Sequence, residues 1–415
     1  MGLEKIDHIV VLMLENRSFD HLLGHLRLDG RDEVDGLTGN ETNRDGDEEF
    51  RVFPLEDTVF RADPHHSMEQ VAVQLEGLNG GFVRSFADKA RARGMSPGEI
   101  MGYHPARNLP TYDRLAREYA VCHRWFASFP GPTWPNRFFS YCGHSGGIVK
   151  NLQLLDAPTI FEHVERAGHT FKYYSHDIAF LRTIRRFTAA REPFRKISDF
   201  YASCQRGELP DVAWIDPRFT LGESPWGTIF TNDDHPPADV LRGQALVARI
   251  YNALLFAPGE LFRKTLLIIV YDEHGGFYDH FPPPGAPPPH ADQRFARYGV
   301  RVPALCVSPW IPRGYVSSEV FDHTSIIRTI RNRFCPDMKY GAMGARVEAA
   351  NDLATLLQLQ APRKAAELPV APAIAIEEQI DVPPSISAFQ HTDLQRDLAE
   401  LRRIALAEGA PPDVL

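Results

Sequence analysis

Several features are scarce in this chain of 415 residues, and each scarcity narrows the class of protein. The five cysteines are scattered and never form a C-x-x-C pair, which disfavours both a disulfide framework and a cysteine zinc site. Apolar runs are short: after the N-terminus the longest covers residues 266–270, far fewer than the roughly 20 residues that cross a bilayer. No basic block is present, and a net charge of −9 argues against nucleic acid as a partner.

Targeting signals are also missing from the chain as written. The early apolar run ends at Glu15 without a small-residue cleavage site, so it does not resemble a secretory signal. We therefore expect a cytoplasmic protein with no transmembrane segment, although related proteins could be exported through a leader that this chain lacks. The sequence shows no internal repeat and indicates no oligomeric state.

Two apolar runs end abruptly in polar pairs. The first, residues 9–14, stops at Glu15 and Asn16, and the second, residues 265–271, stops at Asp272 and Glu273. Both runs have the length of buried strands, and in open parallel sheets ligands bind at the strand ends. Solvated acids at two unrelated strand ends would give the same pattern, because spacing does not establish that the strands are neighbours.

If these four residues meet, they require a cation. Burying several carboxylates together is unfavourable unless a metal or basic groups neutralise them. The four side chains offer hard oxygen ligands, which suit magnesium, calcium or manganese, while nearby histidines leave zinc open. The prediction is therefore a divalent metal site whose ion the sequence does not identify.

The remaining pattern predicts an α/β fold with a mostly parallel central sheet, because strands alternate with helices. Further strands are expected at 170–174, 211–215 and 302–307, and helices at 68–74, 109–118, 161–167, 238–255 and 325–334. The acidic stretch 29–49 and the proline-rich stretch 281–289 are predicted to be loops. A terminal helix is expected to place Leu394, Leu398, Leu401 and Ala405 on one face.

A third polar cluster lies at Thr133, which precedes an aromatic helix containing Phe138, Phe139 and Tyr141. The position predicts that Thr133 is the N-cap of this helix. A hydroxyl at a helix N-terminus also lies in positive potential, where a phosphate is stabilised and the threonine can act as a nucleophile. Capping and catalysis are both open at this point.

Four sequence blocks carry a family resemblance. ENRSFDH at 15–21, TWPNR at 133–137, DEHGGFYDH at 272–280 and RVPALCVSPW at 301–310 resemble, in order, the signature blocks of the phosphoesterase family. This family contains non-specific phospholipases C and a branch of bacterial acid phosphatases. The resemblance implies an alkaline-phosphatase-like three-layer sandwich, with residues 1–362 as the catalytic domain and 363–415 as an extension whose terminal helix packs on the body.

The resemblance also implies roles for individual residues. Glu15, Asn16, Asp272 and Glu273 would hold the metal, and Thr133 would be the nucleophile and a further metal contact. The blocks at 63–67 and 232–237 point to three more catalytic residues: His66, Asp234 and His235. Asn136, Arg137 and His280 are candidates for substrate binding, although Arg137 would equally suit pairing with an acid to hold the loop.

The resemblance favours a metal-dependent phosphoesterase of the phospholipase C type that forms a phosphothreonine. The first alternative is an acid phosphatase acting on small phosphomonoesters, and the second is a catalytically silent metal- or phosphate-binding protein. Histidine suits protonation of a leaving alkoxide, which makes His66 or His235 the expected general acid. Apolar residues at the mouth would admit a lipid, and the candidates are Phe277, Tyr278, Phe281, Trp226 and Phe230, for which packing within the loops is the alternative role.

Overall fold

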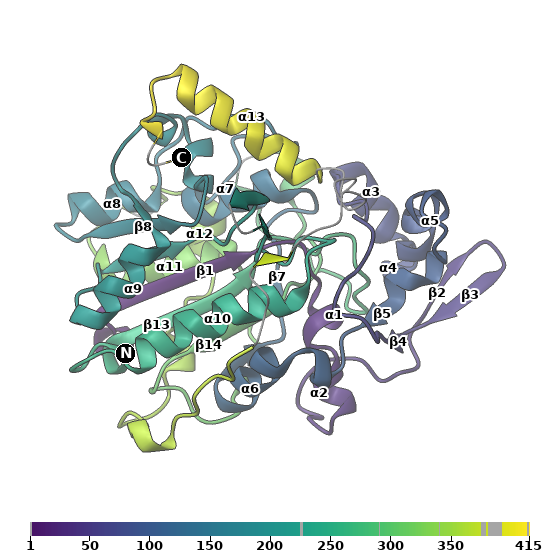
Figure 1. Ribbon diagram of the computed structural model, residues 1–415, viewed down its shortest axis with the longest axis horizontal. Helices are drawn as coiled ribbons and strands as arrows, with labels where there is room; N and C mark the ends of the chain where they lie inside the picture. The colour runs from purple at the N-terminus through teal and green to yellow at the C-terminus, as the bar shows by residue number, and fades with distance from the viewer. Residues whose placement is uncertain are drawn as a thin grey trace.

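The computed structural model describes residues 2–224, 227–289, 291–339, 341–374, 379–380, 392–412 and 415. Its centre is an eight-stranded, mostly parallel sheet (Figure 1). In spatial order the strands are β15 (Val316–Ser317), β6 (Ala120–Cys122), β14 (Ala304–Val307), β13 (Thr265–Tyr271), β1 (His8–Leu14), β10 (Val212–Ile215), β8 (Phe171–Ser175) and β9 (Phe194–Lys196). The prediction of an α/β fold with a mostly parallel central sheet is confirmed.

The middle strands are apolar on both faces because helices cover both faces. All seven residues of β13 are buried, without the alternation that a half-exposed strand would show. One group of contacting helices consists of α6 (Pro110–Glu118), α9 (Ile197–Arg206) and α10 (Val240–Leu255). The other group consists of α7 (Thr133–Cys142), α8 (Ile160–Arg166), α11 (His323–Phe334) and α12 (Ala345–Ala349).

A smaller lobe lies at one side of the sheet (Figure 1). Its elements are α3 (Met68–Gln74), α4 (Glu76–Asn79), α5 (Phe82–Ala92), β2 (Thr42–Asp45), β3 (Glu48–Arg51), β4 (Phe53–Pro54) and β5 (Gly102–Tyr103). The lobe has an apolar core of its own, and α1 (Phe19–Leu23) contacts β5. The prediction of a loop over 29–49 is wrong in part, because β2 and β3 form an antiparallel hairpin whose cross-strand backbone bonds need no apolar pattern.

The terminal helix α13 (Asp393–Ala407) buries Leu394, Leu398, Leu401 and Ala405, as predicted, and contacts the turn Phe180–Thr183. The division of the chain at residue 362 stays a prediction. The expected surface-wrapping stretch 367–384 lies partly outside the described residues. Residues 281–289 form a loop without helix or strand, which agrees with their proline content.

Candidate active site

The two polar strand ends are neighbours. β1 and β13 run parallel, and their last residues, Leu14 and Tyr271, are paired in register. The next residues therefore emerge together at one edge of the sheet. The Asp272 amide donates to the Leu14 carbonyl at 3.0 Å, and the Asn16 amide donates to Asp272 Oδ1 at 3.1 Å. The two strand ends, which spacing alone could not place together, therefore lie side by side.

The glycine turn after β13 lets the two strand ends approach closely. Gly275 has φ = +62°, and a Cβ at this position would lie 2.3 Å from the Asn16 carbonyl oxygen. No side chain larger than hydrogen fits there without a backbone shift. The Gly275 amide also donates to Glu273 Oε2 at 2.7 Å, which orients the carboxylate.

Thr133 lies against the first strand end. It is the first residue of α7, whose N-cap is Pro132, so the predicted N-cap position is wrong. Its hydroxyl is buried and donates to Glu15 Oε2 at 3.2 Å instead of accepting a bond from the helix backbone. The next amide, that of Trp134, is capped by Asn151 Oδ1 at 3.0 Å. The Thr133 oxygen therefore faces Glu15 rather than its own helix.

Arg137 and Asn136 hold this arrangement through bonds to protein groups. Arg137 is fully buried; its Nε donates to Glu15 Oε1 at 2.9 Å and its Nη1 to Asp216 Oδ1 at 3.0 Å. Asn136 Nδ2 donates to three carbonyls of the preceding loop, those of Phe129, Gly131 and Pro132. Pairing with acids, the alternative considered for Arg137, is therefore the contact that the structure shows.

The two predicted histidines lie beside the second strand end. His66 Nε2 is 4.0 Å from Glu273 Oε1, and the rings of His66 and His235 are 6.1 Å apart. His66 Nδ1 lies 2.9 Å from the Pro64 carbonyl oxygen and His235 Nδ1 lies 2.7 Å from that of Pro236. Each Nδ1 has a backbone partner, which leaves the opposite ring nitrogen to face the site. Asp63 joins them, since ligand atoms of Asp63, His66 and His235 lie within 4.8 Å of one another.

Asp234 is held by hydrogen bonds to neighbouring side chains. Its Oδ2 accepts hydrogen bonds from the hydroxyls of Tyr112 and Tyr271, and its carbonyl accepts one from Arg17 Nε at 2.8 Å. The neighbouring Asp233 lies closer to the strand end, because its carbonyl accepts from the Glu15 amide at 2.8 Å. The structure thus gives the predicted catalytic Asp234 the contacts of a buried anchor.

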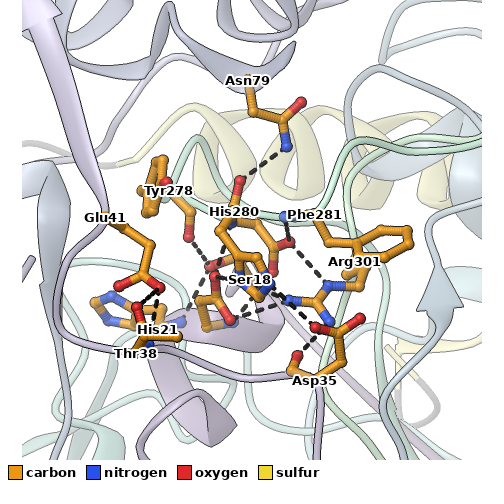
Figure 2. A network of polar contacts seen from close by, with 12 residues as sticks. Ser18, His21, Asp35, Thr38, Glu41, Asn79, Tyr278, His280, Phe281 and Arg301 are labelled. Carbon is orange, nitrogen blue, oxygen red and sulfur yellow. Dashed lines mark hydrogen bonds and ion pairs between the residues drawn. The ribbon is translucent and has the colours of Figure 1, made fainter.

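His280 belongs to a separate buried network (Figure 2). Its Nδ1 lies 2.7 Å from Asp20 Oδ2, and its Nε2 lies 3.3 Å from Asp35 Oδ1. Arg301 completes the network by donating to Asp20 at 3.0 Å and to Asp279 at 2.8 Å. Both ring nitrogens of His280 therefore have carboxylate partners, and the structure does not place this residue beside Thr133.

Electrostatics at the strand ends favours a cation. Burial and the Asp272 carboxylate raise the pKa of Glu15 well above its usual range, although Arg137 opposes this shift. Burial also raises the pKa of Glu273 to about 8, partly offset by His66. Asn16 Oδ1, Asp272 Oδ2 and Glu273 Oε1 are buried and lack a hydrogen-bond partner within the described part of the chain. Oxygens left in this state are suitable ligands for a divalent metal.

Four residues of the site were missed in the sequence, and one of them, Asp233, lies in the same block as Asp234. Asp63 lies in the same block as His66. Asp216 directly follows strand β10, and a polar residue directly after an apolar strand is the same signal that identified the two other strand ends. Asn151 had no such signal. It reaches the Trp134 amide from a loop, and its own Nδ2 donates to Asp397 of α13 at 2.9 Å.

Comparison with known proteins now adds to this geometry. The family model described as "Phosphoesterase family" matches residues 6–335. The chain belongs to the phosphoesterase family. It is 33% identical to non-specific phospholipase C3 of Arabidopsis thaliana, over 95% of this chain and 81% of the relative. Non-specific phospholipase C6 of the same plant is 37% identical, over 79% of this chain and 68% of the relative. Phospholipase C B of Mycobacterium tuberculosis (strain CDC 1551 / Oshkosh) is 29% identical, over 80% of this chain and 74% of the relative.

Among solved structures, this phosphoesterase is similar to a protein of the alkaline phosphatase superfamily from Vibrio parahaemolyticus. The TM-score is 0.40 at 10% identity, over 79% of this chain and 66% of that one. Family membership makes the protein a phosphoric ester hydrolase, and its carboxylate and histidine clusters are suited to a divalent metal. Within the residues that are described, no helix is both long and apolar enough to cross a membrane.

Proposed function

We propose that this phosphoesterase is of the non-specific phospholipase C type and hydrolyses phosphate esters through a phosphothreonine at Thr133. The observation that carries the proposal is the placement of the Thr133 hydroxyl, 3.2 Å from Glu15 Oε2 at the start of α7. The same edge of the sheet supplies oxygens of Asn16, Asp272 and Glu273 that have no hydrogen-bond partner among the described residues. A nucleophile, a carboxylate and a cation site thus meet where the helix N-terminus favours a phosphate.

Glu15, Asn16, Asp272 and Glu273 are the residues that would hold a divalent metal, with Thr133 beside them. A bound divalent ion supplies positive charge that stabilises an oxyanion and favours loss of a hydroxyl proton. Magnesium, calcium and manganese match these oxygen ligands, and zinc also fits if His66 or His235 contributes.

The chain's own residues divide the work as follows. Arg137 holds Glu15 in place through its Nε, and Glu15 accepts the Thr133 hydrogen bond, which orients the hydroxyl oxygen. The Thr133 oxygen attacks phosphorus while its proton passes to the Glu15 carboxylate and the ester bond breaks. His66 or His235 donates a proton to the departing alcohol oxygen. A water molecule then gives a proton to the same histidine and attacks the phosphothreonine, and Thr133 regains its proton from Glu15 as phosphate or a phosphorylated head group is released.

A cavity of about 230 Å³ beside His235 and Asp233 would take the apolar part of the ester. Phe230 lines it, as predicted for the mouth, together with Val59 and Leu221. The predictions for Phe277 and Tyr278 are wrong, because both are buried in the core of the smaller lobe. Phe281 packs partly buried beside Phe126, and Trp226 lies outside the described residues.

This cavity favours a phospholipid as substrate, while an acid phosphatase acting on soluble phosphomonoesters would need only the strand-end residues. Hydrolysis should be compared on p-nitrophenyl phosphate, p-nitrophenyl phosphorylcholine and phosphatidylcholine. We expect all three to be cleaved. Activity on the monoester alone would favour the acid phosphatase, and activity on none would favour the silent binding protein.

The covalent step has its own test. Thr133→Ala should lower kcat by at least about a thousandfold, because a catalytic nucleophile has no substitute. Thr133→Ser keeps the hydroxyl and is the matched control, with an expected loss within roughly tenfold. Acid quenching with labelled substrate should leave phosphate on threonine in the unsubstituted protein. Full activity of Thr133→Ala would exclude the mechanism.

A further inference from the structure

A further group of metal-ligating residue types lies outside the candidate active site, between α6 and the short helix α2 (His25–Leu28) (Figure 1). His25, Asp29 and Asp113 each offer one ligand atom, and these atoms lie within 4.8 Å of one another. We call these three residues the helix-pair cluster. None of them has a part in the hydrolysis proposed above.

The two helices explain how the cluster forms. His25 is the first residue of α2 and Asp29 directly follows its last residue, so the two are one helical turn apart and share a face. Asp113 lies in the first turn of α6 and faces them. The cluster therefore joins two segments that are more than 80 positions apart in the chain.

The His25 ring is oriented as a metal ligand would be. Its side chain is only 1% exposed, and its Nδ1 lies 3.1 Å from the Leu22 carbonyl oxygen. Because a carbonyl can only accept a hydrogen bond, Nδ1 carries the proton of the neutral ring and Nε2 carries the lone pair. Nε2 is buried, points toward the two carboxylates and has no hydrogen-bond partner within the described ranges of the chain. A metal-bound histidine usually donates its other N–H to a carbonyl or carboxylate in this way.

The distances favour a shared ion over direct hydrogen bonds. His25 Nε2 lies 3.7 Å from Asp113 Oδ1 and 4.0 Å from Asp29 Oδ2, beyond the range of about 2.7–3.2 Å for N–H···O bonds. In the His280 network, by contrast, an imidazole nitrogen lies 2.7 Å from its carboxylate. Ligand atoms about 2.0–2.2 Å from one tetrahedral zinc ion lie roughly 3.4 Å apart, so side-chain movements of less than about 1 Å would complete such a site.

Arg117 is the cation that faces these acids in the structure. Its Nε donates to Asp113 Oδ1 at 2.9 Å, and its Nη2 lies 3.6 Å from Asp29 Oδ2. The Arg117 side chain is 40% exposed, as is that of Asp29. Arg117 can therefore turn into solvent at little cost, because exposed ion pairs contribute little to stability. The same exposure gives an ion a path to the cluster from solvent.

We propose that His25, Asp29 and Asp113 bind one divalent ion of the zinc type, which displaces Arg117 and keeps water as its fourth ligand. One imidazole and two carboxylates suit zinc, whereas calcium and magnesium prefer oxygen ligands alone. The ion would link α2 to α6, which contacts strands β6 and β14 of the central sheet. The proposal does not rest on the proposed function, because the cluster shares no residue with the candidate active site.

The first measurement is calorimetric titration of the full chain with Zn²⁺. Asp29→Asn should lose one binding event per chain or weaken it by at least about tenfold, since even indirect supports of a metal site are worth that much. Asp32→Asn is the matched control, because it removes an exposed acid three positions along the chain. The control should bind Zn²⁺ as the unsubstituted protein does, and Zn²⁺ should raise its Tm more than that of Asp29→Asn.

Two further variants test the assignment to individual side chains. His25→Gln should lose the same event; if this buried substitution prevents folding, the exposed Asp29→Asn still decides the question. Arg117→Gln removes the competing cation and should tighten Zn²⁺ binding by roughly threefold to tenfold. Unchanged or weaker binding by Arg117→Gln would contradict the displacement that the proposal requires.

The cluster is separated from the strand-end site by Asp272→Asn. This variant removes a proposed strand-end ligand and should retain the event that Asp29→Asn loses, whether or not the protein hydrolyses phosphate esters. Loss of that same event in Asp272→Asn would assign it to the strand ends and overturn the proposal. Zn²⁺ binding by Asp29→Asn and His25→Gln that matches the binding by Asp32→Asn would overturn it as well.

Discussion

The network around His280 predicts a pH-dependent stability. Three carboxylates, Asp20, Asp35 and Asp279, face two basic groups, His280 and Arg301. Burial disfavours a charged imidazole, but contacts with Asp20 and Asp35 overcome it and raise the pKa of His280 to about 10. The folded protein therefore holds a proton on His280 at neutral pH that the unfolded chain releases.

The size of the effect follows from this difference. Each pKa unit corresponds to about 1.4 kcal/mol, so a rise from 6.5 to about 10 represents roughly 5 kcal/mol. The His280 side chain is 21% exposed, and solvent screening lowers its expected contribution to stability to about 3–5 kcal/mol. Because the folded pKa is raised, the contribution is complete below about pH 6.5 and disappears as the pH rises through about 10.

The assay is denaturant unfolding of the full chain and of His280→Gln between pH 6 and pH 10.5. Glutamine keeps a hydrogen-bond donor but removes the charge, so the variant should be less stable by about 3–5 kcal/mol at pH 6, and the two curves should converge near pH 10. His65→Gln is the control, because its partner Asp88 is 74% exposed and surface pairs contribute little. Parallel curves for the protein and His280→Gln across this range would refute the reasoning.

Three further predictions concern the active site. His66→Gln and His235→Gln are compared on a phosphate ester of p-nitrophenol and on one of a simple alkanol. Loss of the general acid should lower kcat roughly a hundredfold or more for the alkanol ester and only slightly for the p-nitrophenyl ester. Equal losses on both esters would contradict a proton-donating role. Gly275→Ala should lower the free energy of unfolding by more than about 2 kcal/mol, because its Cβ would lie 2.3 Å from the Asn16 carbonyl oxygen. Gly168→Ala is the control: it is also at positive φ but has open space around it, so it should show only the backbone strain of about 1 kcal/mol. Equal losses of the two variants in chemical denaturation would exclude the steric effect. Chelation should lower both Tm and hydrolysis, each restored by one of Mg²⁺, Ca²⁺, Mn²⁺ or Zn²⁺, and a Tm insensitive to chelator and to added ions would count against a bound metal.

Long buried elements of the fold were predictable because their burial leaves a local pattern. The strand 265–271 was predicted with the bounds that β13 has in the structure, and the helix predicted at 238–255 corresponds to α10, which begins two residues later. The hairpin of β2 and β3 was missed because its residues are mostly exposed and polar, so no apolar alternation marks it. Its stability comes from backbone pairing across the hairpin, which residue types alone do not reveal.

The site was predictable where chemistry follows a strand end and less so where it depends on distant partners. Glu15 and Asp272 stood out because an apolar run stops at each of them. The N-cap prediction for Thr133 failed because its hydroxyl bonds to Glu15, 118 positions away in the chain. The contacts of His280 were likewise not predictable, because its carboxylate partners come from two distant segments of the chain, near residues 20 and 35.

The position of β1 has a consequence for biosynthesis. This strand is made first, yet its sheet neighbours are β10 and β13, which leave the ribosome only after residues 212–215 and 265–271 have been made. Until then, the apolar strand His8–Leu14 has no partner on either edge, and such edges are prone to aggregation. Folding of the central sheet is therefore a late, long-range event. A nascent chain arrested before residue 265 should depend on a chaperone to stay in solution.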